Sequence, residues 1–157
     1  MDLHSSATYL CAGALPDGEL MLRPVAPKDV GVDWAAIRPG LEIVKKMTTD
    51  DWMPEDVYMM LKNGGATLYI GEGEAGDYLG FIVLRLIPTF HGSKIEIWCA
   101  YSATKKQLMS SYWPQIQEIA KQAGANKITF SSAREEWGVC AQRIGFEQKQ
   151  VSYEFRL

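Results

Sequence analysis

The sequence predicts a mixed α/β fold in which helices cover both faces of one sheet. Strand-like and helix-like segments follow one another in the order strand, two helices, three strands, helix, strand, helix, strand. The three central strand-like segments lie close together in the chain, which is typical of antiparallel hairpins. A long helical pattern separates the third of them from the next strand. Such a right-handed crossover makes the two strands parallel or next-nearest in one sheet.

The chain is predicted to hold an N-terminal arm at residues 1–18 and a single domain at residues 19–157. The arm ends where Pro16, Asp17 and Gly18 form a turn signal. A strand is expected at residues 20–23. It should stop at Pro24, because proline has no backbone N–H to donate.

Two helical regions are predicted next. Asp33 is a suitable N-cap for a helix that Pro39 and Gly40 interrupt and that resumes over residues 41–47. Pro54 suits the first turn of a second helix, because the first backbone N–H groups of a helix have no partner within it.

The remaining elements are separated by glycine, proline and short polar turns. The expected segments are strands at 66–71, 78–87 and 93–101, a helix at 104–123 that Pro114 kinks or splits, a strand at 127–131, a helix at 134–144 and a strand at 148–155. In the last segment, Val151, Tyr153 and Phe155 alternate with polar residues, which is the period of a strand.

The composition favours a packed globular protein that binds neither nucleic acid nor a membrane. Hydrophobic residues make up 47% of the chain, and the net charge of −3 gives no global basic field to attract nucleic acid. No apolar run approaches the roughly 18–20 residues of a membrane helix, and the N-terminus lacks the positive charge of a signal peptide. We therefore expect a cytoplasmic protein, and we predict no metal site.

Four segments carry a resemblance to the GNAT superfamily of acyl-CoA N-acyltransferases. They are LMLRPVAPKD at 20–29, YLGFIVL at 78–84, AKQAGANKITF at 120–130 and AQRIGFE at 141–147. The segments resemble the opening strand, a bent central strand, the end of the central helix with the fifth strand, and the closing helix with its Gly-Phe pair. This resemblance implies a GNAT-like, mostly antiparallel sheet of six to seven strands.

The resemblance also implies where acetyl-CoA binds. In this superfamily the fourth and fifth strands splay apart, and the backbone of the fourth strand binds the pantetheine arm. Here that edge would include Trp98, Cys99, Ala100 and Tyr101. The pyrophosphate would meet the following helix N-terminus, where unpaired N–H groups favour an anion.

The phosphate turn departs from the superfamily pattern, because residues 101–108 contain no glycine. A Cβ at those positions keeps the backbone away from phosphate. Thr104, Lys105 and Lys106 are the residues here that would bind the phosphates through hydroxyl and charge. The alternative interpretation of the same residues is a capped, solvated first helical turn.

Two positions bear on the catalytic groups. Glu96 on the fourth strand is a candidate base, and strict alternation would place it on one face with Lys94, Trp98 and Ala100. The alternative is an exposed carboxylate paired with Lys94 or Arg85. Where the superfamily often has a tyrosine acid, the matching position is Ala141, which has no proton to donate.

Two functions are compatible with the sequence. The first is transfer of an acetyl group from acetyl-CoA to an amine on a small molecule or a protein, with residues 33–65 shaping the acceptor pocket. Four carboxylates of this region can attract a cationic amine: Asp50, Asp51, Glu55 and Asp56.

The second function is protein binding without catalysis. The chain is similar in size to small GNAT-like proteins of tailed phages that lack the phosphate loop. A catalytically inactive virion or assembly component would bind a protein partner, or a second copy as a homo-oligomer, and would be located in the virion. Fold alone does not choose between these two functions.

Overall fold

A computed structural model describes residues 21–104, 108–134 and 136–157. The predicted arm at 1–18 lies outside the described residues. The sheet has five strands in the order β1-β2-β3-β4-β5: β1 at Met21–Val25, β2 at Thr67–Glu72, β3 at Tyr78–Thr89, β4 at Gly92–Ser102 and β5 at Lys127–Phe130. Neighbouring strands are antiparallel except β4 and β5, which are parallel, so the predicted mixed, mostly antiparallel sheet is confirmed.

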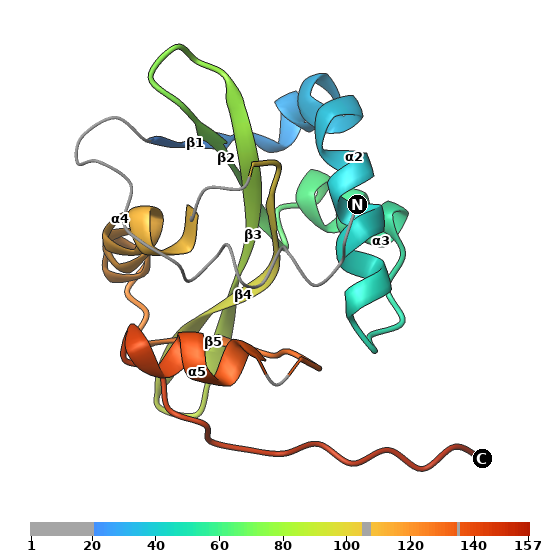
Figure 1. The fold of residues 1–157 in the computed structure, drawn as a ribbon, viewed down its shortest axis with the longest axis vertical. Helices are drawn as coiled ribbons and strands as arrows, with labels where there is room; N and C mark the ends of the chain where they lie inside the picture. The colour runs from blue at the N-terminus through green and yellow to red at the C-terminus, as the bar shows by residue number, and fades with distance from the viewer. Residues whose placement is uncertain (1–20, 105–107, 135) are drawn as a thin grey trace.

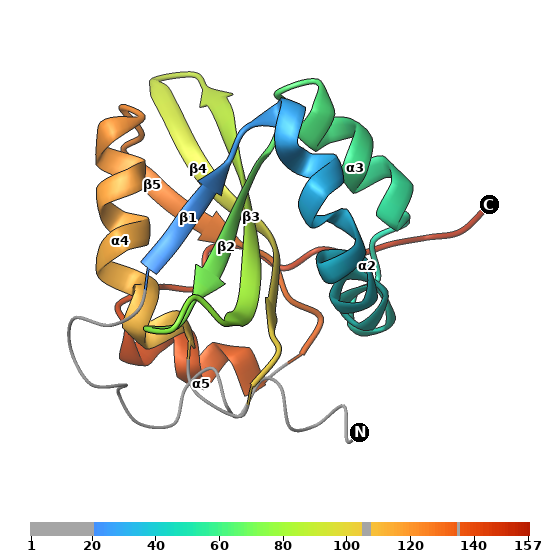
Figure 2. The same cartoon turned by 90° about the horizontal axis from the view of Figure 1, so that it is seen from above.

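Helices cover both faces of this sheet, as predicted (Figure 1). A short 3-10 turn at Pro27–Asp29 leads into α2 at Val30–Met47, and α3 follows at Pro54–Lys62. These two helices lie on one face, while α4 at Leu108–Gln122 lies on the other (Figure 2). The last helix, α5, spans Glu136–Arg143. No helix in the described ranges is both long and apolar enough to cross a membrane.

Each face has its own buried core. Between the sheet and α2 and α3, the fully buried side chains include Ile37, Leu41 and Val57. Between the sheet and α4, Tyr112 and Ile116 pack against the strands. Burying such side chains contributes roughly 1.5–3 kcal/mol each, so these apolar stripes determine which face of each helix meets the sheet.

The structure overturns two predictions based on proline and the split of the helix predicted at Pro114. Strand β1 continues through Pro24, which pairs in register with Tyr69. This is allowed because β1 is an edge strand, so the missing N–H of proline can face away from β2. Helix α2 runs without interruption through Pro39, and α4 runs through Pro114. Both prolines are exposed, and buried neighbours on the sheet side hold each helix in place.

A β-bulge in β4 overturns the predicted alternation of faces. Val83 pairs with Cys99 and Leu84 pairs with Ile97, so Trp98 is the extra residue on β4. Before the bulge, Ile97 packs in the core on the α4 side. After it, Cys99 packs in the core on the α2 side, while Ala100 packs on the α4 side. Glu96, Trp98 and Ala100 therefore do not share one face.

The C-terminal segment differs most from the prediction. Residues 148–155 are not a strand, and the described part of the chain forms a sheet of five strands rather than six or seven. The chain reverses at Gly145, whose φ of +101° favours glycine, and Phe146 then packs against Trp113. From residue 147 onward every residue is exposed, and the segment extends away from the domain (Figure 1).

Candidate functional site

Strands β4 and β5 separate partway along their length. They pair over only four positions, from Lys94 with Lys127 to Ile97 with Phe130. Beyond Ile97, β4 continues to Ser102. The segment that follows β5 instead leaves the sheet after Phe130 and turns toward α5. Within the described ranges, the β4 backbone therefore has no strand beside it on this side. A cavity of about 140 Å³ opens at the separation.

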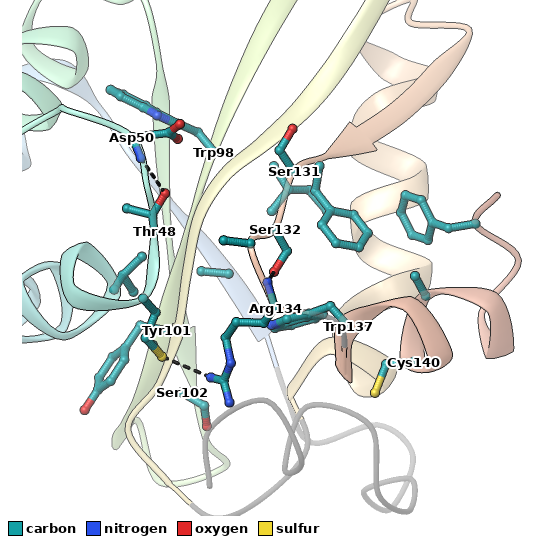
Figure 3. Close-up of a pocket in the computed structure, with 18 of the residues that line it drawn as sticks. Thr48, Asp50, Trp98, Tyr101, Ser102, Ser131, Ser132, Arg134, Trp137 and Cys140 are labelled. Atoms are coloured by element: carbon teal, nitrogen blue, oxygen red, sulfur yellow. Dashed lines mark hydrogen bonds between the residues drawn. The ribbon is translucent and has the colours of Figure 1, made fainter. Parts of the chain in front are cut away.

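Three segments from distant parts of the sequence line this cavity. Strand β4 contributes Trp98 and Tyr101, and the end of α2 with the following loop contributes Thr48 and Asp50. The segment after β5 contributes a third group, which includes Ser131. Figure 3 shows Thr48 and Asp50 on one side of β4 and Ser131 on the other.

Arg134 connects two of these segments, the end of α2 and the segment after β5. Its Nη1 donates a hydrogen bond to the Met47 sulfur at 3.1 Å, so the chain after β5 is joined to the end of α2 (Figure 3). The backbone N–H of Arg134 also donates to the Ser132 hydroxyl at 3.1 Å. Arg134 and Arg143 both line the cavity and bring positive charge to its α5 side.

Asp50 brings a carboxylate to the opposite wall. Its backbone N–H donates to the Thr48 hydroxyl at 3.2 Å, and its carbonyl accepts a hydrogen bond from the Lys45 ammonium. These bonds hold the loop in place. Within the described part of the chain, the Asp50 carboxylate itself has neither a hydrogen bond nor an ion pair. The cavity therefore has an acidic group on the α2 side and basic groups on the α5 side.

Aromatic side chains form the floor between these walls. The Trp52 and Trp98 rings meet edge to face, with centroids 6.1 Å apart. Trp52 is buried, and Lys45 lies 5.5 Å from its ring centroid. Packed aromatic pairs of this kind are stiff and contribute about 0.5–1.5 kcal/mol beyond burial. The floor of the cavity is thus held in one arrangement.

Glu96 lies beside this floor but does not line the cavity. Its carboxylate accepts a hydrogen bond from Arg85 Nε at 3.1 Å, and the two residues pair directly across β3 and β4. The Arg85 guanidinium also stacks 4.3 Å from the Trp98 ring centroid. The structure therefore brings Glu96 together with Arg85 and Trp98.

The predicted cofactor-binding residues fall in three places. Trp98, Ala100 and Tyr101 line the cavity. Cys99 does not line it: its thiol is buried in the α2-side core, and burial raises the pKa of the Cys99 thiol to about 12. Such a thiol is a poor nucleophile, because the thiolate is the reactive form.

The phosphate turn is described only in part. The Ser102 hydroxyl donates to the Thr104 carbonyl at 2.8 Å and accepts a hydrogen bond from the Thr104 N–H at 3.4 Å. Lys105 and Lys106 lie outside the described residues. The Thr104 amide is therefore engaged by its neighbour in this structure.

The segment after β5, together with α5, contributes cavity residues that the sequence analysis did not predict. Ser131, Ser132 and Arg134 follow the β5 strand directly, and Trp137 comes from α5. A polar run at the end of a strand was the available signal, because the carboxyl ends of strands often carry site residues in α/β folds. Ala141 also lines the cavity, at the position where the resemblance places a tyrosine.

Comparison with solved structures identifies the fold. An aminoglycoside acetyltransferase from an uncultured soil metagenomic sample matches with a TM-score of 0.66 at 12% sequence identity, over 90% of this chain and 98% of that one. Ribosomal-protein-alanine N-acetyltransferase from Brucella melitensis matches with a TM-score of 0.65 at 11% identity, covering 88% and 99%. An acetyltransferase from Trypanosoma brucei matches with a TM-score of 0.60 at 17% identity, covering 88% and 99%.

No protein-family model and no curated protein matches the sequence. The similarity to solved acetyltransferases at such low identity defines the fold and not the activity. The chain therefore has the fold of the GNAT acetyltransferases, and its particular activity has to be argued from the cavity.

Proposed function

We propose that the chain is an N-acyltransferase that transfers an acetyl group from acetyl-CoA to an amine. The cavity at the separation of β4 and β5 carries this proposal. Within the described residues, no strand pairs with β4 beyond Ile97 on this side, and the Trp52 and Trp98 rings line the same cavity. An extended pantetheine arm can add to such an edge as a strand does, through main-chain hydrogen bonds. Acetyl-CoA would supply the activated acyl group.

The residues around the cavity suit the separate parts of this reaction. Backbone N–H groups of β4 would stabilise the negative charge that develops on the thioester oxygen as the amine nitrogen attacks. The ammonium of the acceptor first loses a proton to water, so that its neutral nitrogen can attack. The C–N bond forms, the C–S bond breaks, the CoA thiolate leaves, and the second proton of the nitrogen passes to water. Ala141 cannot protonate this thiolate, but a thiol has an ordinary pKa near 8.5. The thiolate is therefore a competent leaving group without an acid.

The positive side of the cavity suits the phosphates of the coenzyme. Arg134 and Arg143 line the cavity on the α5 side, and arginine is the preferred partner of phosphate oxygens. Lys105 and Lys106 add further positive charge in the sequence at the predicted phosphate turn. In this proposal, charge replaces the glycines that the turn lacks.

The test is stabilisation of the protein by acetyl-CoA. A ligand that binds only the native state at a concentration of about 100 times its dissociation constant adds about 2.7 kcal/mol to the free energy of unfolding. For a chain of this size that raises the melting temperature by roughly 5–10 °C. Adenosine monophosphate is the control, because it lacks the pantetheine arm. No shift at millimolar acetyl-CoA would reject the acyltransferase and favour the protein-binding alternative.

We further propose that Asp50 attracts the acceptor amine as its ammonium form. The Asp50 carboxylate lines the cavity, whereas two other carboxylates of the predicted group are occupied elsewhere. Glu55 pairs with Arg38 Nη1, and Asp56 accepts a hydrogen bond from the Met53 N–H at 2.7 Å. Asp51 is exposed and does not line the cavity.

Replacing Asp50 with asparagine should therefore raise the KM for a cationic amine. An exposed ion pair contributes about 0.2–1 kcal/mol, so the expected increase is roughly 1.5–5-fold. The melting-temperature shift with acetyl-CoA should not change. Asp51→Asn is the matched control and should leave the KM unaltered. Steady-state kinetics with a panel of polyamines and aminoglycosides would measure both variants. Equal KM values for the two variants would exclude this role of Asp50.

A further inference from the structure

The C-terminal segment, residues 147–157, has the pattern of a strand but no strand partner. Its odd-numbered positions from Val151 onward are apolar, and its even-numbered positions are polar. The Tyr153 and Phe155 side chains are 93% and 88% exposed. On the polar side, Arg156 Nε lies 3.0 Å from the Glu154 carboxylate, as expected for residues two apart on one face of an extended chain.

The outer edge of β5 is the complementary surface. β5 is the last strand in the sheet order, and within the described ranges only β4 pairs with it. Unpaired edges of this kind are templates for another strand. β5 also leaves its own core incompletely covered, because Ile128 and Phe130 are only partly buried. Within the described residues, β5 therefore forms the edge of the sheet, and its apolar side chains are only partly covered.

The C-terminal segment begins next to β5 but does not pack along it. Phe146 packs against Phe130 of β5 and Trp113 of α4, with ring centroids 5.0 Å apart in both pairs. From residue 147 the chain extends outward rather than turning back along β5 (Figure 1). Within the described residues, a single copy thus carries an exposed segment with the alternation of a strand and an unpaired sheet edge, and the segment does not lie along that edge.

We propose that two copies of this chain exchange their C-terminal segments, each placing residues 148–155 along β5 of the other copy. The exchange is reciprocal, so both edges are covered by one twofold interface. The two aromatic side chains of each segment alone bury about 150–250 Å² per ring, or roughly 600–1,000 Å² for both segments together. Together with the surface of β5 that they cover, the total buried area reaches the roughly 1,200–2,000 Å² of stable interfaces. The proposal is independent of the acetyltransferase activity.

Its test uses the full chain and two double variants. Tyr153→Lys with Phe155→Lys places charge on the apolar side of the segment, and Gln150→Lys with Ser152→Lys places the same charge on the polar side. Molar mass is measured by light scattering over about a hundredfold range of concentration, because association follows mass action. Hydrogen exchange measures the protection of the backbone amides at 127–130 and 148–155.

We expect the wild type and the polar-side variant to be dimers in which both stretches are protected. The apolar-side variant should have about half that molar mass and no protection at 148–155. Its melting temperature at low concentration should match that of the wild-type monomer, since these side chains are exposed. A monomeric wild type overturns the proposal, whether 148–155 is unprotected or is protected on its own β5. A dimer that survives Tyr153→Lys with Phe155→Lys overturns it as well.

Discussion

Substituting Gly40 with alanine is expected to lower the melting temperature, although alanine is the better helix former. Gly40 is buried in the middle of α2, where the helix meets β3 and β4. A Cβ there would lie 2.5 Å from Cδ1 of Tyr101 and 2.8 Å from Cε1 of Phe81. The centroids of these two rings are 5.8 Å apart, so each ring restricts the movement of the other.

Two opposing effects determine the sign of this change. Replacing a helical glycine with alanine ordinarily stabilises a protein by about 0.5–1 kcal/mol. Forcing an extra carbon into a packed core costs about 1–3 kcal/mol. We expect the cost of the extra carbon to exceed the gain in helix propensity, and the melting temperature to fall by roughly 2–8 °C. Because Tyr101 lines the cavity, the shift caused by acetyl-CoA should also decrease.

Gly31 on the same helix is the matched control. It is exposed, and a Cβ there would have only the Tyr58 hydroxyl within 4 Å, at 3.8 Å. Gly31→Ala should therefore leave the melting temperature unchanged or raise it. Thermal unfolding followed by circular dichroism separates the two variants. If both substitutions raise the melting temperature equally, then α2 does not approach the sheet as closely as the structure shows.

The order and class of the elements could be predicted because they depend on local patterns. The apolar spacing of α4 and the short links between the three central strands are visible in any window of the sequence. Where the predictions were wrong, the deciding fact was a neighbour far along the chain. Pro24 is tolerated because β1 is an edge strand, and an edge position is a property of the completed sheet.

The cavity was predictable only in part for the same reason. Trp98, Ala100 and Tyr101 were placed at it by the resemblance, but strict alternation put Ala100 on the wrong face of the sheet. The bulge at Trp98 arises from the register between β3 and β4, which no local pattern in β4 reveals. The role of the chain after Phe130 depends on where β5 leaves β4, and this too is set by pairing.

Filling the separation between β4 and β5 is expected to abolish acetyl-CoA binding. Ser131 follows the last paired residue of β5, lines the cavity and is exposed, so a larger side chain there does not enter either core. An indole in place of its hydroxyl would occupy much of the cavity of about 140 Å³. Ser131→Trp should weaken acetyl-CoA binding at least about 100-fold, equivalent to about 2.7 kcal/mol.

The measurement compares melting temperatures with and without acetyl-CoA. Without ligand, Ser131→Trp should melt close to the wild type, because its side chain replaces solvent and not packed protein. With acetyl-CoA, the roughly 5–10 °C increase of the wild type should be lost. Gln117→Trp, at an exposed position on α4 away from the cavity, should keep the full increase. If Ser131→Trp keeps it too, the coenzyme does not bind between β4 and β5, since an indole and a pantetheine arm cannot share that space.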